Sequence, residues 1–316
     1  MNKHQIILGD CIEGMKTLPD QCIHTCITSP PYFGLRSYNG GEQEIGIEDT
    51  VDEYVQSLVE VFREVKRILR DDGTLWLNLG DSYMSAKNVS PPPQTIGGQR
   101  GMPTDGVVPG NRREQKGLKH KDLIGIPWRV AFALQADGWW LRQDIIWHKP
   151  NPMPESVEDR CTKSHEYIFL LSKNSHYYFD NQSIKEPTVG MGKTNIRFGG
   201  NKYGDSTDPK HATKSGNKYT DSGLRNKRSV WTVNTKGYKG VHFATFPRDL
   251  IVPCVLAGSP VGGIVLDPFN GSGTTGVVSL NLGREYIGCE LNPEYIKITE
   301  TRIKDEVPNT LEGIME

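Results

Sequence analysis

The chain has 316 residues and a formal net charge of −1, with 37 Lys and Arg against 38 Asp and Glu, a length that fits one elaborated α/β domain or one domain with an insertion. No leader segment opens the sequence and no apolar stretch reaches the roughly 18 residues of a membrane helix, so we expect a cytoplasmic protein with no membrane association. The six cysteines show no C-x-x-C spacing, which favours reduced thiols and gives no metal site.

The predicted elements alternate between strands and helices, as in an α/β fold. The clearest helix, residues 51–70, follows a capping box formed by Thr50 and Glu53 and is expected to stop at Gly73. Apolar runs and helical spacing predict the remaining elements: strands at 5–8, 23–27, 74–79, 145–148, 168–171, 264–266 and 286–289, and helices at 127–136 and 274–282.

The strand predicted at 23–27 runs into Ser29-Pro30-Pro31-Tyr32. Two consecutive prolines suit neither a helix interior nor a central strand, so the chain leaves the sheet there with a stiff backbone. The Ser29 hydroxyl and the Pro30 carbonyl can accept both hydrogens of an NH2 group, and the Tyr32 ring offers a flat face. The implied substrate is an aromatic ring with an exocyclic amine. The alternative is that the prolines end a strand and Tyr32 fills the core.

Positive charge gathers in two polar segments, 85–121 and 185–239. The first holds 7 Lys and Arg against 2 Asp and Glu, and the second holds 12 against 4. Both lack apolar periodicity, and the second carries interleaved aromatic residues. This combination is typical of nucleic-acid binding, although solvated loops would have a similar composition.

A nucleotide-type cofactor loop is predicted near the end of the chain. Residues 263–275 combine a buried strand, a glycine-rich turn and the start of a helix. Glycines let the backbone approach a ligand closely, and Asp267 at the end of the strand can take a cationic or hydroxyl group. The next strand ends in Glu290, about 20 residues further on, where an acid binds ribose hydroxyls in dinucleotide folds.

These motifs resemble those of the DNA amino-methyltransferases, which modify cytosine N4 or adenine N6 using S-adenosylmethionine. TSPPY at 28–32 matches their catalytic tetrapeptide and DPFNGSGTT at 267–275 matches their cofactor loop. Residues 242–247 resemble the segment that holds the methionine end of the cofactor, and Asp10 resembles the acid that reads its adenine amine. The motif order is that of the permuted beta group, and 147–156 resembles a segment lining the substrate pocket.

The resemblance implies a Rossmann-like α/β sheet of the S-adenosylmethionine-dependent methyltransferases, with helices on both faces and an inserted, loop-rich target-recognition region. It implies a catalytic half at 1–180 that includes a basic DNA-contacting loop at 85–121, a target-recognition region at 181–238, and a cofactor-binding half at 239–316 that completes the same domain. The implied cofactor is S-adenosylmethionine and the implied partner is double-stranded DNA. The resemblance leaves open whether the protein forms a homodimer. It also leaves open whether a cognate restriction enzyme exists or whether this is an orphan or phage enzyme that has no such partner.

The residue assignments that follow from the resemblance fall into three groups, and no metal ligand is among them. The catalytic residues are Ser29, Pro30, Pro31 and Tyr32. The cofactor-binding residues are Asp10, Cys11, Ser29, Thr245, Phe246, Asp267, Pro268, Phe269, Gly271, Ser272, Gly273, Thr274, Glu290, Leu291 and Asn292. The DNA-binding residues are Arg36, Arg112, Arg113, Lys149, Lys214, Lys218, Arg225, Lys227 and Arg228.

Other classes of protein fit the motifs less well. A nicotinamide-dependent dehydrogenase would need the third glycine of G-x-G-x-x-G and would have no use for the SPPY turn. An RNA or protein amide methyltransferase would share the cofactor loop, but the basic segments favour DNA. A non-catalytic DNA-binding module would not need both motifs. In the resembling family Ser at the first position goes mostly with cytosine N4, so Ser29 favours cytosine N4, with adenine N6 as the alternative.

Overall fold

The computed structural model describes residues 3–34, 44–85, 95–96, 99–100, 115–188, 223–235 and 246–308. The chain divides into two compact units, one formed by Met1–Asp180 and Arg228–Glu316 and the other by Asn181–Lys227. The predicted residues Arg36, Arg112, Arg113, Lys214, Lys218 and Thr245 lie outside the described residues.

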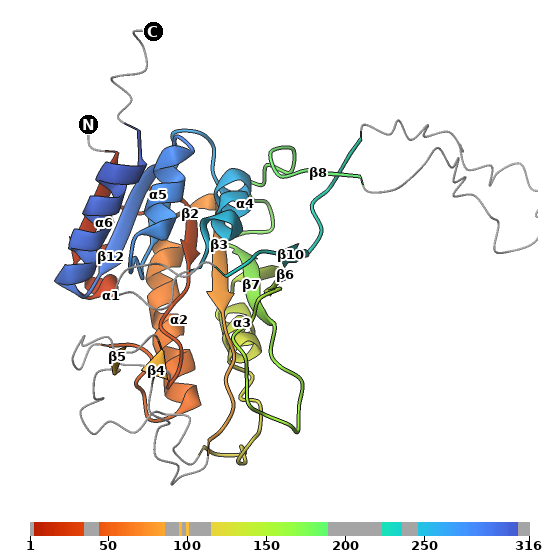
Figure 1. Cartoon of the computed structure of the whole chain (residues 1–316). Helices are drawn as coiled ribbons and strands as arrows, with labels where there is room; N and C mark the ends of the chain where they lie inside the picture. Colours follow the sequence, from red (N-terminus) through yellow and green to blue (C-terminus); the bar gives the residue numbers. More distant parts are fainter. Residues whose placement is uncertain are drawn as a thin grey trace, which may run out of the picture. The chain divides into compact units, whose positions relative to one another are not determined.

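The larger unit is built on one eight-stranded sheet (Figure 1). Its strands lie in the order β1-β12-β11-β2-β3-β7-β6-β10, and all neighbours are parallel except β7, which is antiparallel to β3 and to β6. The strand bounds are β1 His4–Leu8, β2 Ile23–Thr28, β3 Leu69–Leu79, β6 Trp140–His148, β7 His165–Ser172, β10 Val230–Thr232, β11 Ile264–Asp267 and β12 Glu285–Glu290. Two short strands, β4 (Thr95–Ile96) and β5 (Gln99–Arg100), pair antiparallel with each other and form a separate sheet.

Helices cover both faces of the sheet. Leu75 and Leu77 of β3 lie in a core with the apolar residues of α1 (Cys11–Lys16), α2 (Val51–Ile68) and α3 (Ile126–Ala136). Trp76 points to the other face, where a Cβ on Gly258 of α4 would come within 2.8 Å of the indole nitrogen. Helix α4 spans Arg248–Gly258, and two further helices come after it in the chain, α5 (Thr274–Asn281) and α6 (Pro293–Glu306). This arrangement confirms the predicted Rossmann-like α/β class.

Helix α2 begins as predicted and ends earlier than predicted. The Thr50 hydroxyl accepts from the Glu53 N–H at 3.1 Å, and the Glu53 carboxylate accepts from the Thr50 N–H at 2.9 Å. Gly73 is not the stop, because the helix ends at Ile68 and Leu69 already has extended backbone. Leu69 pairs with Ile23 of β2, so the chain passes directly from helix into β3 and Gly73 lies within that strand.

Every predicted strand and helix is present, with shifts of a few residues at the ends. The described part also contains elements that were not predicted, among them α1, α4, α6 and β10. In the smaller unit, β8 (Glu186–Pro187) pairs antiparallel with β9 (Leu224–Arg225). Among the described helices, none is long and apolar enough to cross a membrane.

Candidate active site

The predicted catalytic residues and the predicted acids of the cofactor site lie at one edge of the sheet in the larger unit. Strands β1, β12, β11 and β2 are parallel neighbours, so their carboxyl ends meet there, and Asp10, Glu290, Asp267 and Ser29 lie at those ends. Because β7 is antiparallel, its first residues reach the same edge and bring Glu166 there. We call this the carboxyl edge. In open α/β sheets this is where ligands bind.

The Ser29–Tyr32 turn follows β2 directly. The Pro31 carbonyl accepts a hydrogen bond from the Tyr54 hydroxyl of α2 at 2.8 Å, which fixes the turn to the neighbouring helix. Within the part of the chain that the structure describes, the Pro30 carbonyl accepts no hydrogen bond. The Pro31 carbonyl therefore holds the shape of the turn, and the Pro30 carbonyl stays available for a ligand.

Tyr32 is held at both its ring and its hydroxyl. The hydroxyl donates to a Glu166 carboxylate oxygen at 2.7 Å. The ring lies against Gly80 so closely that a Cβ there would come within 2.5 Å of it. Burial and the Glu166 charge raise the pKa of Tyr32 well above its usual value, and a hydrogen bond with the Ser29 side chain acts in the opposite direction. Tyr32 therefore carries a neutral hydroxyl, and the Ser29 side chain lies within hydrogen-bonding reach of it.

Asp267 joins the Ser29–Tyr32 turn to the glycine-rich loop. Its carboxylate accepts from the Thr28 hydroxyl at 2.6 Å, from the Thr275 hydroxyl of α5 at 2.7 Å, and from the Phe269 N–H at 3.0 Å. Only 2% of the residue is exposed, and burial raises its pKa to about 6. These contacts set the position of residues 267–275 against Ser29. The predicted contact of Asp267 with the methionine ammonium stays a prediction, since the chain itself already supplies three donors.

Glu290 lies at the carboxyl end of β12, beside the same loop. Its carboxylate accepts from the Gly271 N–H at 2.7 Å and from the Asn292 N–H at 2.9 Å. Burial raises its pKa to about 7, although the N–H groups of Asn292, Gly271 and Leu291 favour the ionised form. An ionised carboxylate has about four lone-pair positions, so it can still accept from a further donor. The Glu290 backbone carbonyl accepts from the Gly9 N–H at 2.9 Å, which brings Asp10 next to it.

The glycine-rich loop is supported from behind by residues that sequence reasoning missed. Gly273 has φ of +75°, and a Cβ there would come within 2.5 Å of Thr299 Cγ2 on α6. The Arg302 guanidinium donates to the Ser272 carbonyl at 2.6 Å, and Asn270 donates to the Thr299 hydroxyl at 2.9 Å. Asn292 and Pro293 are the start signal of α6 and could have predicted this helix. Nothing in the sequence indicates that Thr299 and Arg302 face the loop.

The predicted DNA-binding residues that the structure describes have partners within the chain. The Lys149 ammonium forms an ion pair with Glu166 and lies 4.2 Å from the centre of the Trp147 ring. Arg225 pairs with Glu186 of the smaller unit at 3.0 Å. The Arg228 carbonyl accepts from the Trp231 indole at 2.7 Å. Contact of these side chains with DNA stays a prediction.

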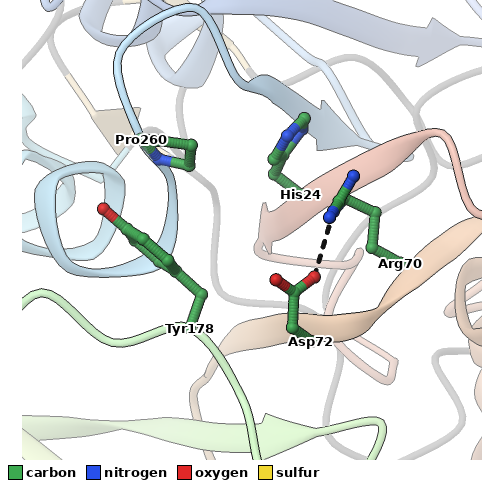
Figure 2. Close-up of a pocket in the computed structure, with 5 residues that line it drawn as sticks. All are labelled: His24, Arg70, Asp72, Tyr178 and Pro260. Atoms are coloured by element: carbon green, nitrogen blue, oxygen red, sulfur yellow. Dashed lines mark hydrogen bonds and ion pairs between the residues drawn. The ribbon is translucent and has the colours of Figure 1, made fainter.

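A pocket in the larger unit lies at the opposite, amino-terminal edge of the sheet. Figure 2 shows His24, Arg70, Asp72, Tyr178 and Pro260 around it, with Arg70 and Asp72 paired at 3.0 Å. His24 is near the start of β2 and accepts from the Ile264 N–H at the start of β11, 2.9 Å away. The pocket is therefore separated from the motifs of the carboxyl edge by the length of the strands.

The sequence matches a known family and has close relatives. The profile of the N6/N4 methyltransferase family, described as DNA methylase, matches residues 23–301. The chain is 50% identical over 299 residues to the type II methyltransferase M.SmaI of Serratia marcescens. This alignment covers 95% of this chain and 90% of that protein. It is 44% identical over 311 residues to the type II methyltransferase M.Cfr9I of Citrobacter freundii, with 98% and 91% covered.

Solved structures share the fold at lower identity. The PvuII DNA methyltransferase, described as cytosine-N4-specific, aligns with a TM-score of 0.63 and 18% identity, covering 98% of this chain and 88% of that one. A Thermus thermophilus protein crystallised with S-adenosyl-L-methionine aligns with a TM-score of 0.58 and 23% identity, covering 97% of each. At these identities the likeness concerns the fold.

Proposed function

The chain belongs to the N6/N4 DNA methylase family, and from that membership we propose that the position it methylates is the exocyclic N4 of cytosine. The protein is a DNA methyltransferase that uses S-adenosyl-L-methionine. Ser29 at the first position of the tetrapeptide supports cytosine, because this residue goes mostly with cytosine N4 in the resembling family. The PvuII enzyme, which shares the fold, is described as specific for the same atom. Adenine N6 is the alternative.

The observation that carries direct methyl transfer, as distinct from the choice of base, is the hydrogen bond between Thr28 and Asp267. It joins the residue before Ser29 to the first residue of the DPFNGSGTT loop, although 239 positions separate the two in sequence. A group bound along residues 267–275 therefore lies next to the turn that holds the target amine. This closeness is what direct transfer between two bound molecules requires.

The proposed reaction places a base, flipped out of the duplex, against Tyr32. The Ser29 hydroxyl and the free Pro30 carbonyl accept the two N–H groups of its amine. An exocyclic amine is a poor nucleophile because its lone pair is delocalised into the ring. Acceptors outside the ring plane favour a pyramidal nitrogen and stabilise its developing positive charge. When bound, S-adenosyl-L-methionine supplies a methyl group already activated by its sulfonium, so alignment provides most of the remaining acceleration.

The identity of the modified base tests the proposal directly. Plasmid DNA incubated with the protein and S-adenosyl-L-methionine is digested to nucleosides, and the methylated product is identified by mass. We expect N4-methylcytosine. A clean N6-methyladenine product would overturn the choice of base and leave the amino-methyltransferase activity standing, whereas methylation of RNA or protein alone would overturn the choice of substrate.

The residues of the carboxyl edge fit the cofactor. The acceptor capacity that remains on the Glu290 carboxylate suits a ribose hydroxyl, and the neighbouring Asp10 suits the adenine amine. We expect Glu290→Ala to weaken S-adenosyl-L-methionine binding by roughly tenfold or more, as the loss of hydrogen bonds to a charged group does. Isothermal calorimetry measures this change, and unchanged affinity would remove Glu290 from the ribose site.

The pH dependence of this binding follows from the raised pKa of Glu290. The ribose hydroxyls donate more strongly to the ionised carboxylate than to the protonated one, so cofactor binding below pH 7 favours loss of the Glu290 proton. Cofactor affinity should therefore fall as the pH drops through about 7, by up to tenfold per pH unit, and the Asp267 pKa of about 6 should add a second decrease. Calorimetry from pH 8 to pH 5.5 tests this, and Glu290→Gln should remove the step near pH 7. A wild-type affinity that does not change with pH would contradict it.

DNA affinity is proposed to reside in the basic segments. Neutralising five residues together should flatten the dependence of log affinity on log salt by roughly 0.9 for each phosphate that the protein no longer neutralises, because fewer counterions are released. The five are Lys214, Lys218, Arg225, Lys227 and Arg228. Neutralising the exposed Lys16 and Lys297, which pair with carboxylates on their own helices, is the matched control. An unchanged slope in the five-residue variant would show that this segment does not contact phosphate.

The relatives M.SmaI and M.Cfr9I are named type II methyltransferases. On that basis the chain is proposed to act as the modification enzyme of a restriction-modification system, beside a restriction enzyme that recognises the same sequence. A homodimer is retained as a proposal for the assembly. Sedimentation of the protein with and without duplex DNA distinguishes one bound copy from two.

A further inference from the structure

Glu166 is a nearly buried carboxylate at the carboxyl edge that the proposed reaction leaves without a role. Its side chain is 15% exposed and comes from the antiparallel strand β7. It accepts from the Tyr32 hydroxyl at 2.7 Å and from the Asn78 amide at 3.2 Å, and it forms an ion pair with Lys149. A buried carboxylate with this many partners has one fixed position.

The three partners of Glu166 come from different parts of the sheet. Tyr32 follows β2, Asn78 belongs to β3, and Lys149 follows β6. The Asn78 amide also donates to the Tyr167 carbonyl at 3.0 Å, which ties β3 to β7 next to Glu166. The carboxylate is therefore held by groups from β3 and from the residue that follows β6, independently of Tyr32.

The structure restrains the Tyr32 hydroxyl with hydrogen bonds to Glu166 at 2.7 Å and to the Asn78 amide oxygen at 3.4 Å. The ring lies against Gly80, where no side chain holds it, and a Cβ would be within 2.5 Å. The hydroxyl is at the far end of the ring from the backbone, so a hydrogen bond there restrains the tilt of the whole ring. A base can stack on Tyr32 in one orientation only if this tilt is fixed.

We propose that Glu166, held by Lys149 and Asn78, is a positioning residue that fixes the ring of Tyr32 for stacking of the target base. This role rests on the proposed function, because it acts on the base that the protein methylates. It also assigns Lys149 a place in the network around Tyr32. In this proposal the Ser29–Tyr32 turn depends on Glu166, which lies 134 positions after Tyr32 in the sequence.

A double-mutant cycle tests the role of Glu166. The variants are Tyr32→Phe, Glu166→Ala and the two combined, and the readouts are kcat and KM for DNA methylation together with cofactor affinity by calorimetry. We expect each single variant to lower kcat by about tenfold, since each removes the same contact. The double variant should be no slower than the slower single one, and cofactor affinity should stay unchanged in all three.

Controls separate positioning from folding. Glu166→Gln keeps an acceptor for Tyr32 and should restore part of kcat, and it replaces Glu166→Ala in the cycle if the alanine variant fails to fold. Glu64→Ala removes a similarly buried carboxylate, one that pairs with Arg67 at 2.9 Å on helix α2, and should leave kcat at the wild-type level.

Two results overturn the proposal in distinguishable ways. A wild-type protein that methylates no DNA refutes the proposed function, and the role of Glu166 falls with it. An active wild type in which the effects of Tyr32→Phe and Glu166→Ala on kcat multiply, or in which Glu166→Ala has no effect, overturns the positioning role alone.

Discussion

Replacing Ser29 by alanine is expected to lower the rate of methyl transfer by about 10²- to 10³-fold, the usual cost of removing one group that stabilises developing charge. The hydroxyl is one of two acceptors for the target amine, and the other, the Pro30 carbonyl, cannot orient the nitrogen alone. Cofactor affinity should not change, because the glycine-rich loop is held by Asp267 through Thr28 and Thr275. Transfer of a labelled methyl group in a single turnover measures the rate.

The matched control for this change is Ser57→Ala. Ser57 is a serine of α2 whose hydroxyl donates to the Glu53 carbonyl within the same helix at 3.1 Å. Its loss should leave the transfer rate unaltered. If Ser29→Ala retains wild-type transfer, the hydroxyl does not hold the amine and the proposed reaction fails at its first step.

Gly273→Ala should have the largest effect on cofactor binding, with affinity reduced by more than about tenfold. Two costs combine there: φ is +75°, which an L side chain rarely adopts, and the new Cβ would meet Thr299 Cγ2 at 2.5 Å. The loop must then move away from α6, and the N–H of Gly271 moves with it. Calorimetry with S-adenosyl-L-methionine measures the loss.

Gly262→Ala is the control that separates the steric clash with Thr299 from the backbone strain. Gly262 has φ of +77°, nearly that of Gly273, but no atom lies within 4 Å of its Cβ position. Both variants should lose similar stability from backbone strain, about 1–2 kcal/mol, and only Gly273→Ala should lose cofactor affinity. Equal cofactor affinity in the two variants would show that the packing of the loop on α6 is not required.

The motifs were predictable because their chemistry is local. Ser29 to Tyr32 and Asp267 to Thr275 are short runs in which proline and glycine dictate the backbone, and each follows an apolar strand. The open sheet could also be anticipated from alternating strands and helices. Its spatial order could not, since β11 lies between β2 and β12 only because of long-range pairing.

The supporting residues were not predictable for a related physical reason. Glu166, Thr299 and Arg302 act through side chains that reach another segment, and no local pattern distinguishes them from ordinary residues of a strand or helix. Helix α4 was missed because Pro253 lies inside it, which normally argues against a helix. The stop of α2 was misplaced because tertiary pairing of Leu69 with Ile23 ends the helix before Gly73.

The most direct test of the account is a structure of the protein with bound S-adenosyl-L-methionine. The account predicts the ribose hydroxyls on the Glu290 carboxylate, the adenine amine near Asp10, and the methyl group directed at the space between Ser29 and Tyr32. A cofactor bound at the opposite edge, in the pocket lined by His24 and Arg70, or one whose methyl group points away from Ser29, would contradict it.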